Sequence, residues 1–125
     1  MIKHTSKRLI ASIVLLAGLA VTPLAQAHAH LESASPANQS VVETSPQQLS
    51  LSFSEGVEPS FSGVTLKDGA GKVITTGKAT VDAADNKKLL IPLSSPLAPE
   101  KYQVEWHVVS VDGHKTQGHY EFNVK

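Results

Sequence analysis

Apolar and polar residues alternate with a period of two through most of the chain beyond residue 30. The clearest stretches are residues 49–54, 102–109 and 119–125, in which every second position is aliphatic or aromatic. Such alternation is typical of strands that bury one face, because successive side chains on a strand point to opposite sides. No stretch between the glycines and prolines keeps the 3.6-residue period of an amphipathic helix over a helix's length. The pattern therefore predicts an all-β protein.

Further short strands are predicted at 31–35, 62–67, 72–76 and 88–92. Asp68-Gly69 lies between two of these strands and is a hairpin-turn signal. About seven short strands at turn-marked intervals predict a single antiparallel β-sandwich of the Greek-key type. The core is expected to contain the aromatic residues of the last two strands. Two exposed loops are also expected, at residues 78–86 and 111–117.

The first 27 residues differ from the rest of the chain. Basic residues precede an uncharged run at positions 9–21, and Ala25-Gln26-Ala27 presents the small residues that signal peptidase accepts. This apolar run is shorter than the roughly 20 residues that a bilayer-spanning helix needs. We therefore expect residues 1–27 to be a cleaved secretory signal peptide. Residues 28–125 are then one domain of a secreted protein that is not membrane-embedded.

Composition limits the partners and ligands of this domain. Loss of Lys3, Lys7 and Arg8 with the signal peptide leaves 8 basic against 11 acidic residues, a net charge of −3. The absence of a basic cluster argues against nucleic acid as a partner. The sequence has no cysteine, and its single methionine is Met1. A metal site in the domain must therefore use nitrogen and oxygen ligands, which excludes a soft-ligand site for Cu(I).

Cleavage after Ala27 makes His28 the first residue of a chain that begins His-Ala-His. An N-terminal histidine offers its α-amine and its ring Nδ1 together as a chelate, which no internal histidine can do. The unperturbed pKa values of these groups, about 8 and about 6.5, make both available as donors near neutral pH. The alternative interpretation is a solvated terminus without a ligand role.

His30 leaves two metal-binding modes open. As third residue of the processed chain, it can bind Cu(II) together with the amine and two deprotonated backbone amides, in a square plane that needs no folded protein. In the other mode, the amine and ring of His28 recruit side chains from elsewhere in the fold. His30 is then an extra ligand or a neighbour of the ligands.

Asp112-Gly113-His114 is the second candidate for metal binding, because an Asp-x-His spacing can turn a carboxylate and an imidazole toward one ion. The alternative is a simple turn, since Asp-Gly is a common hairpin signal. Glu55, at the end of a predicted strand, is either a solvated acid or a carboxylate near the metal. His107 and His119 are expected to be surface histidines. A nitrogen-rich set with one carboxylate favours Cu(II), with Zn(II) as the main rival.

These segments together resemble the CopC family of periplasmic copper-binding proteins. The resemblance lies in His28–Leu31, Ser35-Pro36, Leu51–Gly56 and Trp106–His114, and it covers essentially all of residues 28–125. It implies a small cupredoxin-like (Ig-like) Greek-key sandwich that binds Cu(II) tightly. It also implies that His28, Asp112 and His114 are ligands, and that Glu55 is a weaker one. Some family members carry a methionine-rich loop for Cu(I), which is missing here, so one Cu(II) per chain is expected.

The sequence therefore favours a non-enzymatic, monomeric carrier that buffers or delivers periplasmic Cu(II). The resemblance implies delivery to an inner-membrane copper transporter of the CopD type. One alternative is a copper oxygenase, because an N-terminal histidine chelate also occurs in polysaccharide monooxygenases. This short chain lacks exposed aromatic residues suited to a sugar surface, and a carboxylate at the metal would oppose redox cycling. The other alternative is a β-sandwich adhesion or assembly module that binds no metal.

Overall fold

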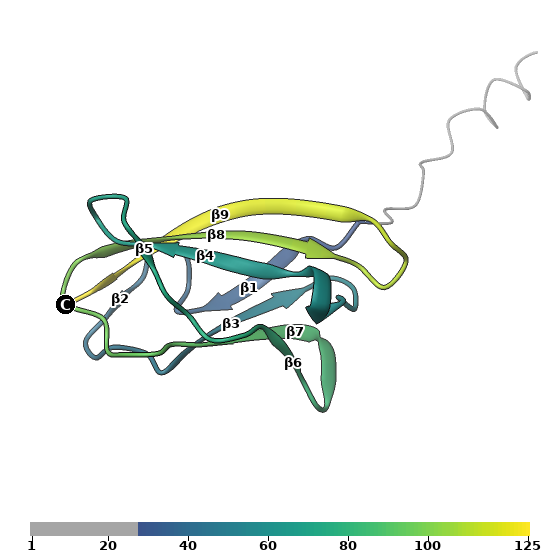
Figure 1. Ribbon diagram of the computed structural model, residues 1–125, viewed down its shortest axis with the longest axis horizontal. Helices are drawn as coiled ribbons and strands as arrows, with labels where there is room; N and C mark the ends of the chain where they lie inside the picture. Colours follow the sequence, from purple (N-terminus) through teal and green to yellow (C-terminus); the bar gives the residue numbers. More distant parts are fainter. Residues whose placement is uncertain (1–27) are drawn as a thin grey trace, which may run out of the picture.

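Strands with one buried face form most of the structure, as the alternation predicts. The computed structural model describes residues 28–125, and the predicted signal peptide lies outside the described residues. Figure 1 shows the strands in two layers. In chain order, the described elements are β1 (Leu31–Ser35), β2 (Val41–Val42), β3 (Gln48–Phe53), the 3-10 turn η1 (Pro59–Phe61), β4 (Gly63–Lys67), β5 (Val73–Ile74), β6 (Thr80–Asp82), β7 (Asp85–Pro92), β8 (Lys101–Val109) and β9 (Lys115–Val124).

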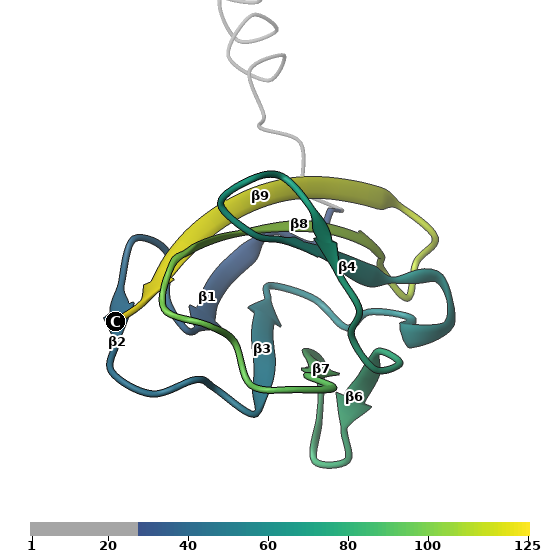
Figure 2. The same cartoon turned by 60° about the vertical axis from the view of Figure 1, so that its left-hand side comes forward.

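The strands divide into a four-stranded sheet, β1-β3-β7-β6, and a five-stranded sheet, β2-β9-β8-β4-β5. All pairs are antiparallel except the short parallel pair of β2 with β9. Figure 2 shows the two sheets stacked, with the chain crossing repeatedly from one to the other. Such crossings are typical of Greek-key sandwiches, so the predicted fold class is confirmed. The strand count exceeds the expected seven because β2 and β6, of two and three residues, are too short to leave a pattern.

The core lies between the two sheets and consists of the predicted inward-facing side chains. In β8, Tyr102, Val104, Trp106 and Val108 are buried, whereas the residues between them are exposed or half-buried. The ring of Trp106 meets that of Phe53 edge-to-face at 5.2 Å, which joins β8 to β3 across the sandwich. Full burial of one large apolar side chain contributes roughly 1.5–3 kcal/mol. This packing holds the ends of β3 and β8 at a fixed separation.

The predicted hairpin at Asp68 is confirmed, and the predicted loop at residues 78–86 is wrong. The Asp68 carboxylate accepts hydrogen bonds of 2.9 Å from the amides of Ala70 and Lys72, which closes the turn between β4 and β5. Residues 78–86 instead contain β6 and the start of β7, which pair as a hairpin. The alternation fails there because both faces of the hairpin tip are exposed. Within residues 28–125, no helix is long and apolar enough to cross a bilayer.

Candidate metal centre

The Asp-x-His motif lies in a tight turn between β8 and β9. The amide of Ser110 donates a 2.9 Å hydrogen bond to the carbonyl of His114, and the amide of Gly113 donates one of 2.8 Å to the carbonyl of Ser110. Gly113 has a φ of 90°, a left-handed conformation that glycine adopts without strain. The turn is shorter than the expected loop at 111–117, because β9 already begins at Lys115. It presents Asp112 and His114 on the exposed end of the sandwich.

The buried side chain of Ser110 forms hydrogen bonds within this turn. Ser110 is fully buried, and its hydroxyl donates a short hydrogen bond to Oδ1 of Asp112. The same Oδ1 lies 3.1 Å from Nδ1 of His114. Two hydrogen bonds lower the pKa of Asp112 from 3.8 to about 2, and the one from Ser110 contributes more than the one from His114. The carboxylate is therefore ionised at neutral pH, and its Oδ2 is the oxygen that these contacts leave available.

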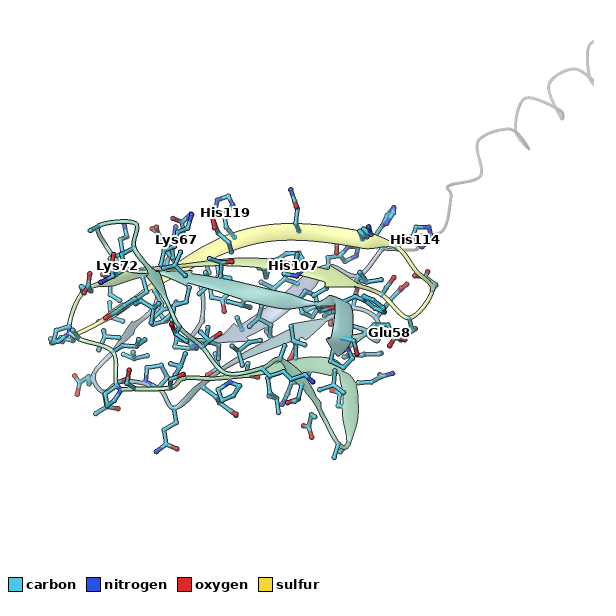
Figure 3. The ribbon with its side chains drawn as sticks, in the orientation of Figure 1. Glu58, Lys67, Lys72, His107, His114 and His119 are labelled. Carbon is cyan, nitrogen blue, oxygen red and sulfur yellow. The ribbon has the colours of Figure 1, made fainter. Side chains whose placement is uncertain are left out.

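The imidazole of His28 approaches this turn from the start of the described chain. Its ring centroid lies 5.0 Å from that of His114, and the two ring planes are nearly perpendicular at 86°. Figure 3 shows His114 at the end of the sandwich where the described chain begins. The fold thus brings together His28 and the Asp112–His114 pair, which are more than 80 residues apart in the sequence.

Hydrogen bonds from β9 and from Ser54, the residue after β3, hold the segment that carries His28. Ala29 is buried, and its carbonyl accepts a 2.8 Å hydrogen bond from the hydroxyl of Thr116 on β9. The amide of His30 donates a 3.0 Å hydrogen bond to Oγ of Ser54, and the amide of Ser54 donates one of 2.9 Å to the carbonyl of His30. The hydroxyl of Ser54 also lies 3.5 Å from the carbonyl of His28. Residue 28 is thereby fixed beside the turn.

The remaining candidate residues are not part of this contact group. In the described part of the chain, no hydrogen bond or ion pair joins the His30 or Glu55 side chain to His28, Asp112 or His114. His107 and His119 are exposed on the outer face of β8 and β9, as expected, and Figure 3 shows both away from His114.

The candidate ligands lie close together but do not yet surround one point. Across residues 28–125, no three histidine or acidic side chains converge closely enough to hold one ion as they stand. Asp112 and His114 contact each other, and the rings of His28 and His114 meet edge to face. His28, Asp112 and His114 are all exposed, so an ion in solution can reach each of them. Ser54, Ser110 and Thr116 were not among the predicted site residues. No sequence motif marks these hydroxyl groups, which position the candidate ligands.

Comparison with known proteins identifies the family. The CopC domain model matches residues 31–125, a range that begins just after His28 and His30. Protein YobA of Escherichia coli K12 is 46% identical over 121 residues, which are 97% of this chain and 98% of the relative. The crystal structure of CopC from Methylosinus trichosporium OB3b has a TM-score of 0.74 at 36% identity, with 78% of this chain and 94% of that chain covered. PcoC of Escherichia coli, described as a methionine-rich copper resistance protein, has a TM-score of 0.70 at 34% identity, with 79% and 100% covered. The chain belongs to the CopC family.

Proposed function

We propose that this protein is a periplasmic Cu(II) carrier that holds one copper ion per chain, with His28, Asp112 and His114 as ligands. The approach of the His28 and His114 rings to 5.0 Å, beside an ionised Asp112, carries the proposal. The related PcoC is a copper resistance protein, which agrees with the proposal. Copper is the cargo in this proposal, and the protein has no catalytic role.

Processing of the precursor supplies one of the donors. Cleavage after Ala27 converts the amide of His28 into a primary amine, which then closes a chelate with Nδ1 of the same ring. The buried Ala29 supports this proposal, because it anchors the chain directly after the chelating residue. An amine, two imidazoles and one carboxylate form a nitrogen-rich set that suits the tetragonal geometry of Cu(II).

The contacts within the turn suggest how its atoms would reach copper. Nδ1 of His114 contacts Oδ1 of Asp112, and the two ring nitrogens of an imidazole point in opposite directions, so this contact must open before both residues bind one ion. Oδ1 of Asp112 also accepts the hydrogen bond from Ser110, which leaves Oδ2 as the oxygen proposed for the metal. His30 and Glu55 remain candidates for additional, weaker contacts.

The carrier role follows from the character of the ligands. An ionised carboxylate and hard nitrogen donors stabilise Cu(II) relative to Cu(I), which opposes the redox cycling that an oxygenase needs. The proposed monomer buffers periplasmic copper or delivers it to an inner-membrane transporter of the CopD type. Copper-dependent peroxide production with ascorbate separates the oxygenase alternative from the carrier, because only the oxygenase sustains it.

The test uses protein exported to the periplasm, with its N-terminal residue verified by mass spectrometry. One equivalent of Cu(II) should give a single tetragonal EPR spectrum, and chelator competition should show tight binding. The His28→Ala variant keeps the amine but loses the ring, and its spectrum should differ. Exported protein that binds no copper in competition with a weak chelator would refute the proposal, and would favour a β-sandwich module without metal.

A further inference from the structure

The processed terminus contains two competing copper sites that share one amine. In the first, which we call the bridging mode, His28 binds copper together with Asp112 and His114. In the second, the terminal mode, the amine, the amide nitrogens of Ala29 and His30 and the ring of His30 surround the metal. A single amine cannot serve both sites at once. The contacts of residues 28–30 with the sandwich therefore decide which site forms.

The backbone of His30 is committed to the sandwich in a way that is incompatible with the terminal mode. Its amide, which would have to become a copper ligand, donates a 3.0 Å hydrogen bond to Oγ of Ser54. Its carbonyl accepts a 2.9 Å hydrogen bond from the amide of Ser54. Copper binding at this amide would break the first bond and rotate the peptide away from β3.

Ala29 is the second obstacle to the terminal mode. The residue is 1% exposed, and its carbonyl accepts the 2.8 Å hydrogen bond from Thr116. The terminal mode wraps residues 28–30 around the metal in one plane, so Ala29 would have to leave the core. Leaving exposes apolar surface and breaks the bond to β9, and both losses disfavour the terminal mode.

We infer that the hydroxyl groups of Ser54 and Thr116 form a clamp that selects the bridging mode over the terminal mode. This inference rests on the proposed function, because it assigns positioning residues to the same copper site. The clamp holds residues 29 and 30 in the sandwich and keeps the ring of His28 beside that of His114 in the turn. Without the clamp, the sequence His-Ala-His is free to bind copper alone.

The magnitude of the effect follows from the two hydrogen bonds. A neutral hydrogen bond of this kind shifts an equilibrium by about fivefold. Removing both hydroxyl groups should therefore raise the population of the detached terminus by about 25-fold relative to the docked one. Copper then binds the detached terminus, because the four nitrogen ligands of the terminal mode all come from residues 28–30.

The experiment compares processed wild-type protein with the double variant Ser54→Ala/Thr116→Val, each loaded with one equivalent of Cu(II). EPR distinguishes the four-nitrogen terminal mode from the bridging mode, which includes a carboxylate oxygen. His114→Ala and His30→Ala are added to each background. We expect the wild-type spectrum to respond to His114→Ala, and the spectrum of the double variant to respond to His30→Ala instead. The matched control, Ser52→Ala/Thr65→Val, removes a serine hydroxyl from β3 and a threonine hydroxyl from the five-stranded sheet and should behave as wild type.

A second variant changes both residues but keeps their hydroxyl groups, and it should restore the wild-type behaviour. Ser54→Thr/Thr116→Ser keeps both donors and should keep the bridging spectrum, which a general loosening of the fold would not explain. A double variant that still depends on His114, in a protein with wild-type circular dichroism, overturns the clamp and leaves the proposed function intact. Wild-type protein that already has the four-nitrogen spectrum and ignores His114→Ala overturns the proposed function itself.

Discussion

The buried hydroxyl of Ser110 donates a hydrogen bond to Oδ1 of Asp112, two residues further along the turn. This contact is the leading cause of the lowered pKa of Asp112. The amide of His114 also points to the Ser110 oxygen, at 3.3 Å, so one hydroxyl contacts both residues of the Asp-x-His motif. The buried serine thus connects the rigid end of β8 to two exposed side chains that are proposed to bind copper.

Replacement of Ser110 by alanine should raise the pKa of Asp112 from about 2 toward its ordinary value of 3.8. Because the pKa in the folded protein is lowered, the carboxylate stabilises the fold above its unfolded pKa, and this contribution disappears as the pH falls through about 2. The variant should lose the larger part of that pH dependence and keep the part that His114 contributes. A carbon-13 NMR titration of the metal-free protein measures the pKa directly. Ser62→Ala, which removes another buried hydroxyl, is the control; an unchanged Asp112 pKa in Ser110→Ala would contradict the assignment.

Replacement of Asp112 or His114 by alanine should weaken Cu(II) binding at least tenfold, which corresponds to about 1.4 kcal/mol for each lost ligand. Both side chains are exposed, so circular dichroism should remain close to wild type. Chelator competition gives the affinities, with His119→Ala on the outer face of β9 as the control. Wild-type affinity in both variants would mean that the terminal residues alone hold the metal.

The mature protein should bind one Cu(II) tightly and Cu(I) only weakly. The proposed site has nitrogen and oxygen donors, and no cysteine or methionine remains after residue 1 to supply a soft ligand. Parallel titrations with chelators specific for each oxidation state measure both affinities. The methionine-rich relative PcoC is a suitable comparison in the Cu(I) titration. A tight Cu(I) site in this chain would be incompatible with the proposed donor set.

The sequence predicted those features of the molecule that depend on neighbouring residues. The alternation from Tyr102 to Val108 identified a buried strand face because each side chain's direction follows from the preceding one. The Asp112-Gly113-His114 spacing likewise indicated a turn with two ligand-type side chains. Contacts between distant residues left no such pattern. Ser54 lies 26 residues from His28, and Thr116 lies 87 residues from Ala29, so only the folded chain reveals that they hold the terminal segment.

Packing beneath β9 leads to a prediction about stability. A Cβ added at Gly118 would lie 2.5 Å from Cζ2 of Trp106, whose ring is confined between the sheets. Gly118→Ala should therefore lower the free energy of unfolding by about 1–3 kcal/mol, a typical cost of overpacking. Gly63→Ala is the control, because its added Cβ meets the exposed and movable ring of His107 at 3.2 Å. Equal unfolding midpoints in denaturant for the two variants would show that Trp106 can shift.

Addition of one residue before His28, such as an initiator methionine, should lower Cu(II) affinity by several orders of magnitude. The extension turns the amine of His28 into an amide, which cannot complete a chelate with Nδ1 of the same ring, and it moves His30 from third to fourth position. Both copper-binding modes are lost together, whereas the contacts of Ala29 with Thr116 and of His30 with Ser54 remain. The thermal stability of the metal-free protein should therefore change little. Chelator competition on processed and extended protein, with both N-termini verified by mass spectrometry, measures the difference; equal affinities would exclude the free terminus as a ligand and direct attention to the internal histidines.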